Sequence, residues 1–302
     1  MQVQRVLQMY RTMQLIRSFD EAAGRAFQDG RIRGPVHRYL GQEAIAAGVC
    51  ASLRPTDYIG GDHGGHGHAI AKGADIGPLM KELFGREGGT CGGKGGPMHI
   101  ADFSVGVLGG NAVTDGAALA VGAAQAVKIL RQDRLVVSFF GDGAVNRGPL
   151  LEAFNWATVY RLPVLLVCED NQYAAAVRTS ELTAGEGIVA RARSFGIPSE
   201  SIDGSDVIAV LDASEKLTTK IRRGEGPALI HARLRPLADD PLQRCQQWLQ
   251  KQGVGTEPVA ALEYEVSAAV EKALRDAEAA PLPRPEAAFG EIQDLGAEAW
   301  PK

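Results

Sequence analysis

Apolar residues at helical spacing mark the first half of the chain. They predict a helix over 1–29 that ends at Gly30, a second helix over 42–53 and a short one near 75–84. The same spacing returns in the alanine-rich stretch 116–131. Apart from the short helix, residues 60–116 show little periodicity, so we predict long, shaped loops there.

From residue 135 onward, continuous apolar runs alternate with amphipathic ones. Continuous apolar strands separated by helices indicate a parallel sheet with helices on both faces. We therefore predict a single α/β domain over 1–302, with a helical N-terminal arm (1–30) and a helical tail (241–302). The predicted strands are 135–140, 163–170, 198–202 and 227–234, and the helices between them are 149–161, 187–195 and 205–223.

Composition and charge narrow the class of protein. The net charge is −4 and no basic run occurs, which argues against a nucleic-acid partner. No apolar run approaches the ~20 residues of a membrane helix, so we expect no membrane partner. The four cysteines are far apart and form no CxxC pair, which predicts reduced thiols and a cytoplasmic location.

Glycine is concentrated in one region. Of the 37 glycines, 18 lie between Gly60 and Gly116, without the three-residue period of collagen. The backbone there is expected to turn tightly or to approach something closely.

The unit 135–173 carries the strongest chemical signal. Asp142 follows its first predicted strand and Asn171 follows its second. If the two strands are neighbours, ~4.8 Å apart, both side-chain oxygens face one point at the carboxyl edge of the sheet. A carboxylate, an amide oxygen and a backbone carbonyl suit Mg²⁺. Gly143 and Ala144 are predicted to open the next helix, whose free N–H groups favour a phosphate.

Each part of this signal also has an ordinary interpretation. GDG alone is a common turn, and Asn171 alone is an ordinary loop residue. A nucleotide-binding domain would need GxGxxG after the first strand, where the chain has GDGAVNRG, so that class is discounted. The combination of residues and spacing favours the metal and phosphate site.

Three strings, the first of them within this unit, make the chain resemble a known family. GDGAVNRG…EAFNWATVYRLPVLLVCEDNQY, HRYLGQEA (37–44) and DHGGHGHAIAKG (62–73) are similar to alpha subunits of thiamine-diphosphate-dependent 2-oxo acid dehydrogenases of the pyruvate and acetoin type. The resemblance extends over nearly the whole chain. It implies a thiamine-diphosphate-binding fold whose glycine-rich region, 60–116, wraps the cofactor.

The resemblance also assigns individual residues. It implies that Asp142 and Asn171 ligate Mg²⁺ by side chain and Tyr173 by its backbone carbonyl. The remaining implied contacts are Gly143, Ala144 and His63 with the diphosphate, the backbone of Ala112 and Thr114 with the aminopyrimidine ring, and His37 near the substrate.

The implied partners follow from what this chain lacks. We find no candidate for the glutamate that activates the pyrimidine, and the resemblance implies that a beta subunit supplies it in an α₂β₂ heterotetramer. The acceptor of the acyl or aldehyde unit stays open between a lipoyl-bearing acyltransferase and a second carbonyl compound.

Among the departures from the family pattern, two remove cationic groups. Gly64 stands where the family has an arginine, and RPLADDP (235–241) replaces a longer segment that contains a histidine. Each loss removes a charge-assisted contact worth ~1.5–3 kcal/mol. A lipoyl-independent carboligase or decarboxylase subunit, and a non-catalytic subunit with a decayed site, are therefore the alternatives.

Histidines cluster in the same region as the glycines. Five of the six lie within 37–99, and His37, His63 and His66 are the predicted catalytic candidates, as proton shuttles or diphosphate donors. HGGHGH as a zinc site is disfavoured because no cysteine or paired carboxylate lies near it. His231, inside a predicted strand, is interpreted as structural.

Overall fold

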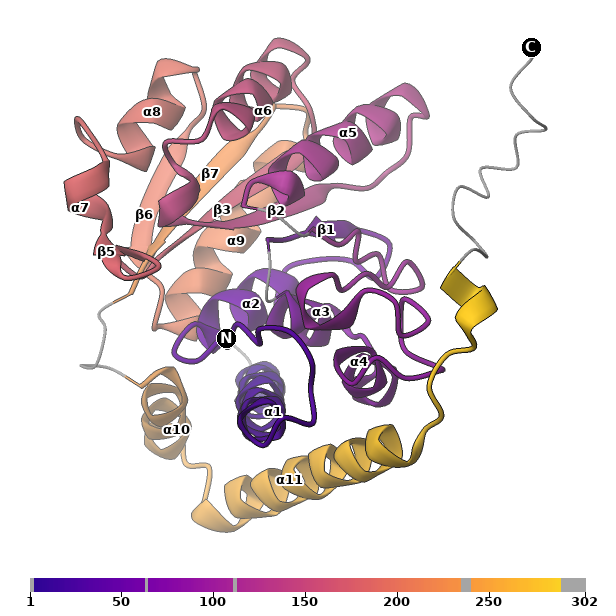
Figure 1. Ribbon diagram of the computed structural model, residues 1–302. Coiled ribbons are helices and arrows are strands. Elements are labelled where there is room, and N and C mark those ends of the chain that lie inside the picture. The colour runs from indigo at the N-terminus through magenta and orange to yellow at the C-terminus, as the bar shows by residue number, and fades with distance from the viewer. Residues whose placement is uncertain (1–2, 63–64, 111–112, 235–239, 289–302) are drawn as a thin grey trace.

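A five-stranded parallel sheet organises the chain (Figure 1). The computed structural model describes residues 3–62, 65–110, 113–234 and 240–288. Within them the strand order is β1-β2-β3-β7-β6. The strands are β1 (Tyr58–Gly60), β2 (Val136–Gly141), β3 (Val164–Asp170), β6 (Ser199–Asp203) and β7 (Ala228–Arg233). The predicted α/β class and the four predicted strands are confirmed.

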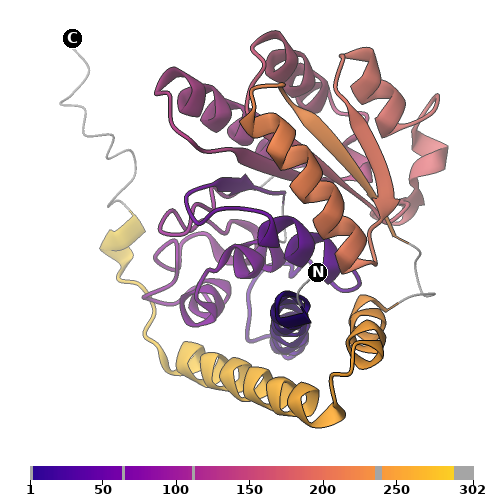
Figure 2. The same ribbon diagram turned by 180° about the vertical axis from the view of Figure 1, so that it is seen from behind.

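Helices cover both faces of this sheet because its central strands are apolar on both sides. Along β2, Val137 and Phe139 enter one hydrophobic cluster and Val136 and Phe140 the opposite one, as the two-residue strand period requires. The clusters are completed by α5 (Asp115–Ile129), α6 (Gly148–Val159) and α8 (Ile188–Ser194) on one face, and by α2 (Glu43–Ala51), α3 (His66–Lys72) and α9 (Val207–Arg222) on the other. Figure 2 shows α9 crossing the second face.

The two ends of the chain and one internal helix form an outer helical layer. It consists of α1 (Val3–Gln28), α4 (Ile76–Leu83), α10 (Pro241–Lys251) and α11 (Thr256–Ala279). The long helix α11 packs along α1 and α4 (Figure 1), and the Tyr10 hydroxyl donates to Glu263 Oε1 at 2.5 Å. Helices thus occur in both segments predicted to be helical. No helix of the described ranges is long and apolar enough to cross a membrane.

The sequence pattern did not predict two elements in or next to the glycine-rich region, namely β1 and α3. Three residues are too few for strand β1 to show a period. Helix α3 depends on a tertiary contact, because a Cβ on Gly67 would lie 2.6 Å from the Tyr39 ring. Both elements exist because distant segments pack against them.

Backbone packed on backbone accounts for part of the glycine excess. A Cβ on Gly110 would lie 1.7 Å from the carbonyl oxygen of Gly61, and one on Gly116 would lie 2.6 Å from the same oxygen. No side chain fits at those separations. At these positions the expected close approach of the backbone is confirmed, and the close neighbour is another segment of the chain.

A buried carboxylate organises the glycine-rich loop 88–96. Glu82, at the end of α4, has no exposed surface and accepts backbone hydrogen bonds at 2.7–3.0 Å. A Cβ on Gly89 would lie 2.3 Å from Glu82 Oε2, so glycine lets the loop close around the carboxylate. The four donors are the N–H groups of Cys91, Gly93, Gly95 and Gly96.

Glu82→Gln is expected to lower the free energy of unfolding by about 2–4 kcal/mol, because an amide leaves buried N–H groups unpaired and removes the charge from the rest. Urea denaturation followed by circular dichroism measures the change. Glu87→Gln, in the same segment but on an exposed side chain, is the matched control and should alter stability little. Equal stability of the two variants would contradict the role given to Glu82.

Candidate active site

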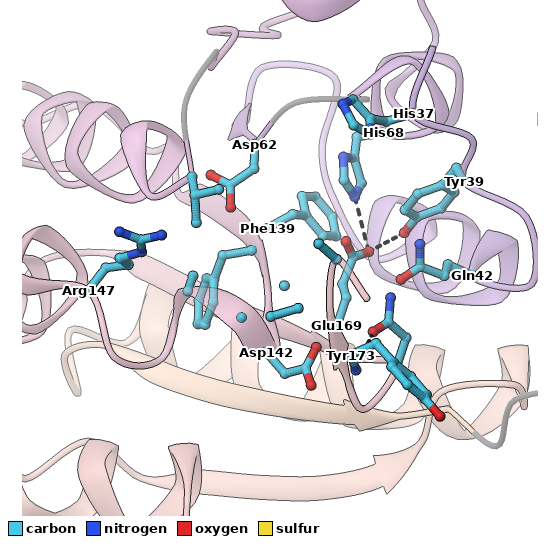
Figure 3. A pocket seen from close by; sticks show the side chains of 18 of the residues that line it. His37, Tyr39, Gln42, Asp62, His68, Phe139, Asp142, Arg147, Glu169 and Tyr173 are labelled. Carbon is cyan, nitrogen blue, oxygen red and sulfur yellow. Dashed lines mark hydrogen bonds and ion pairs between the residues drawn. The ribbon is translucent and has the colours of Figure 1, made fainter. Parts of the chain in front are cut away.

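A cavity of about 590 Å³ opens at the carboxyl edge of the sheet (Figure 3). Strands β2 and β3 pair in parallel, with Phe140 opposite Cys168 and Gly141 opposite Glu169, so the residues that follow both strands meet there. The predicted adjacency of the two strands is confirmed. Six predicted site residues line this cavity: His37, Asp142, Gly143, Ala144, Asn171 and Tyr173.

Asp142 enters the cavity from a 3₁₀ turn, η2 (Asp142–Ala144), directly after β2. The residue is 6 % exposed, and its Oδ2 atom is buried without a hydrogen-bond partner. Burial, with the carboxylate of Asp170 nearby, raises the pKa of Asp142 to about 7. A bound cation would reverse that shift. An orphaned buried carboxylate oxygen fits a metal ligand.

Asn171 and Tyr173 come from the loop after β3. The Tyr173 N–H donates to Asn171 Oδ1 at 2.9 Å, and Gln172 between them has a left-handed backbone with φ 69°. The loop continues into a two-residue strand, β4 (Tyr173–Ala174), which packs on the η2 turn. A Cβ on Gly143 would lie 2.8 Å from the Cβ of Ala174, so glycine permits this close contact between the two segments.

Gly143 and Ala144 do not open the following α-helix, α6, which corrects the sequence prediction. They belong to η2, and α6 begins only at Gly148. Pro149 has no N–H with which to bond the carbonyl of Val145, so a continuous α-helix cannot form through this point. Any anion here would meet a short turn rather than the end of a long helix.

Three residues that the sequence analysis did not single out form the far wall of the cavity. Glu169 Oε1 accepts a hydrogen bond from the Tyr39 hydroxyl and lies 3.0 Å from His68 Nε2. The His68 ring also stacks on Phe139, with ring centroids 4.2 Å apart. The signal was available for Glu169, because strand alternation puts it on the opposite face from Cys168.

Asp62 links the glycine-rich region to the start of α5. Its Oδ1 accepts the Thr114 N–H at 3.0 Å, and Thr114 is buried with a left-handed backbone, φ 84°. Desolvation, partly offset by this bond, raises the pKa of Asp62 to about 7. Asp62 lines the cavity, whereas Thr114, which the resemblance assigns to the aminopyrimidine ring, is not among the residues that line it.

The predicted histidines separate in the structure. His37 is exposed and lines the cavity, whereas His66 has no exposed surface and bonds to Asp20 of α1. This burial corrects the prediction of a catalytic His66, because a ring sealed between α1 and α3 cannot reach a cofactor. His63 and Ala112 lie outside the described residues.

A second cavity, of about 470 Å³, lies beside the first, and Asp142 lines both. In it, His231 Nε2 is 2.7 Å from Asp170 Oδ2, and on the other side of the ring the Ser201 hydroxyl is 3.1 Å from Nδ1. Although burial opposes ionisation, the bonds from His231 and Asp142 lower the pKa of Asp170. His231 therefore has a hydrogen-bond partner on each ring nitrogen.

No three His, Cys, Asp or Glu side chains converge as metal ligands within the described ranges. A metal at Asp142 would thus depend on one carboxylate, the amide oxygen of Asn171, a backbone carbonyl and oxygens from outside the protein. That oxygen-only set is the type Mg²⁺ accepts.

Comparison with known proteins places these residues in a family context. Residues 11–234 match the family described as the dehydrogenase E1 component. The alpha subunits of acetoin:2,6-dichlorophenolindophenol oxidoreductase from Cupriavidus necator and Bacillus subtilis are 39% and 37% identical, covering 93% of this chain and 92% and 91% of theirs. The chloroplastic pyruvate dehydrogenase E1 component subunit alpha-3 of Arabidopsis thaliana is 33% identical over 92% of this chain and 72% of its own.

Asp62→Asn is expected to make stability less dependent on pH. The folded chain holds the Asp62 proton up to about pH 7, whereas the unfolded chain releases it near its ordinary value of 3.8. The stability that the neutral carboxyl contributes is complete below pH 3.8 and is lost as pH rises through 7. Asparagine keeps the bond to Thr114 and cannot ionise, so the variant should gain about 1 kcal/mol or more over the native chain between pH 4 and pH 8.

Urea unfolding at pH 4, 6 and 8 checks this, with Asp212→Asn on the exposed face of α9 as control. A constant difference between Asp62→Asn and the native chain across these pH values would refute it.

Proposed function

This chain belongs to the dehydrogenase E1 component family of thiamine-diphosphate-dependent dehydrogenases, and on that premise we propose a specific role for it. It is the alpha subunit of a heteromeric, Mg²⁺-dependent enzyme that cleaves an acyloin such as acetoin, or a 2-oxo acid, and transfers the acyl or aldehyde unit. The observation that carries the proposal is the meeting of Asp142, Asn171 and Tyr173 at one cavity.

The residues at this cavity fit the cofactor and its metal. Asp142 offers the orphaned oxygen and Asn171 an amide oxygen, and the η2 turn brings the backbone of Gly143 and Ala144 to the same wall. A volume of about 590 Å³ lies within the ~300–1,000 Å³ range of small-molecule sites. When bound, thiamine diphosphate supplies the carbon nucleophile that attacks a carbonyl group.

The wall opposite Asp142 has a different task, which is to order the reacting end of the site. Tyr39 and His68 both bond to Glu169 Oε1 and hold that carboxylate in place. Gln42 lines the same wall, and the exposed His37 is the imidazole positioned to exchange protons with a substrate.

A beta subunit is the proposed partner, in an α₂β₂ assembly. Glu169 is the one glutamate that lines the cavity among the described residues, and its Oε1 is already engaged by Tyr39 and His68. We therefore assign the glutamate that activates the pyrimidine to the partner.

The face formed by α5 and α6 is the proposed docking surface for the beta subunit. An apolar groove of about 360 Å³ runs between the two helices, with Gly122 and Trp156 on its walls. Exposed side chains around it include Leu119 at 47%, Ile129 at 68% and Val159 at 63%. Exposed apolar patches of this kind mark interaction sites. Helix α5 begins at Asp115, directly after Thr114, whose N–H bonds to Asp62 in the cavity wall, so a partner on this face would also lie near the site.

The acceptor distinguishes two versions of the enzyme. The names of the relatives from Cupriavidus necator and Bacillus subtilis include both acetoin and a redox dye. The lack of a histidine in the segment 235–241 favours the alternative, a lipoyl-independent carboligase or decarboxylase. Reduction of 2,6-dichlorophenolindophenol with acetoin or pyruvate tests for the dehydrogenase activity. Formation of an acyloin from pyruvate and an aldehyde tests for the carboligase activity.

The chain co-expressed with its beta subunit is expected to bind thiamine diphosphate only with Mg²⁺. Asp142→Asn should weaken that binding more than tenfold, because the metal loses its one carboxylate ligand, and chelation of Mg²⁺ should have the same effect. Titration calorimetry measures both, with Asp212→Asn as the control. If the native complex binds no thiamine diphosphate, the proposed function is wrong and the non-catalytic alternative holds.

Gly122→Lys is expected to prevent assembly without unfolding the chain. A Cβ at Gly122 meets no atom within 4 Å, and replacing a helical glycine favours the helix, so the isolated chain should keep its stability. A lysine there would fill the groove and place a charge in it. Size-exclusion chromatography with light scattering should show the loss of the heteromer. Ala268→Lys on the exposed face of α11 should assemble normally, and normal assembly of Gly122→Lys would exclude this face.

A further inference from the structure

One arginine on the rim of the cavity has no role in the function proposed so far. Arg147 lines the same cavity as Asp142 and Asn171 and is exposed (Figure 3). Among the described residues its guanidinium forms no hydrogen bond or ion pair. An arginine that is left unpaired on a cavity wall is available to a ligand.

The local backbone determines where Arg147 lies. Its N–H donates to the carbonyl of Ala144 at 2.9 Å, a three-residue spacing that puts the two residues on the same side of the chain. Helix α6 begins at the next residue, Gly148, and Arg147 is its N-cap, with an extended backbone at ψ 135°. Arg147 thus comes three residues after the end of the η2 turn.

A second contact holds this backbone from the opposite side. The side-chain amide of Asn146 donates to the carbonyl of Leu182, at 2.9 Å, and to the hydroxyl of Thr183, at 3.0 Å. Asn146 is therefore tied to the end of α7 (Thr179–Leu182) and to the residue after it, while its neighbour Arg147 lines the cavity.

The negative charges at the site favour a cationic side chain such as that of Arg147. A diphosphate carries more negative charge than one Mg²⁺ neutralises, and Asp142 adds another negative charge beside it. The two cationic groups expected from the family resemblance are absent from the sequence, at Gly64 and in 235–241. Arg38 lines the wall that holds His37 and Gln42, whereas Arg147 comes directly after the residues that face the diphosphate.

We propose that Arg147 binds the diphosphate end of the cofactor and so replaces the cationic contacts that this chain lacks. The proposal rests on the function proposed above. The guanidinium of Arg147 can donate two parallel N–H bonds to two phosphate oxygens at once, which a lysine cannot reproduce. The cation thus comes from the turn before α6 rather than from the glycine-rich region or the loop after β7.

The test is the dissociation constant of thiamine diphosphate, measured by calorimetry on the co-expressed complex in Mg²⁺. Arg147→Gln should raise it by about tenfold or more, and Arg147→Lys by less, because the lysine keeps the charge and loses the fork. The native complex should also lose more affinity with added salt than Arg147→Gln does. Thiamine monophosphate should be less affected by the substitution than thiamine diphosphate.

Arg223→Gln is the matched control, because Arg223 is an exposed arginine at the end of α9, at the opposite edge of the sheet. It should leave the dissociation constant unchanged. Thermal unfolding and light scattering on Arg147→Gln verify that the variant is folded and assembled.

The outcomes separate the two proposals. A native complex that binds the cofactor, with an Arg147→Gln variant of equal affinity, overturns the role of Arg147 and leaves the proposed function intact. Loss of affinity in Arg38→Gln but not in Arg147→Gln overturns it as well, as does loss of assembly in Arg147→Gln with unchanged affinity. A native complex that binds no thiamine diphosphate overturns both proposals.

Discussion

The parallel pairing of β2 with β3 is the constraint on which the site depends. Because Gly141 lies opposite Glu169, the chain leaves both strands at the same level of the sheet edge, and Asp142 and Asn171 follow at once. Burial on both faces holds this register, since a slip by one residue would exchange Val137 and Phe139 with their neighbours between the two hydrophobic clusters. The chemistry is therefore positioned by the core rather than by the loops.

Buried carboxylates shape the loops that surround this edge. Glu82 gathers four backbone N–H groups of the segment 91–96, and Asp62 holds the left-handed Thr114 at the start of α5. Such contacts replace the hydrogen bonds that regular structure would provide. Several of the glycines lie where the backbone must come this close to a carboxylate or to another backbone segment, so part of the glycine-rich composition results from internal packing.

The candidate site could be predicted where the signal is local. Asp142, Asn171 and Tyr173 each stand at a fixed offset from an apolar strand, and the strand pattern was sufficient to bring them together. The histidines show the limit, because HGGHGH contains residues two apart with opposite surroundings. His66 is sealed against Asp20, while His68 reaches Glu169 across 101 positions of sequence. Local composition cannot separate them, since only packing on α1 and β3 decides which ring faces the cavity.

Patterns in the sequence were sufficient to predict the α/β class, the order of the main strands and helices, and the chemical character of the sheet edge. These depend on hydrophobic period and on offsets of a few residues, which are local properties. Strand β1, helix α3 and the burial of His66 emerge only in the tertiary structure. Each of these results from contacts between segments far apart in the chain, whose free energy no local pattern encodes.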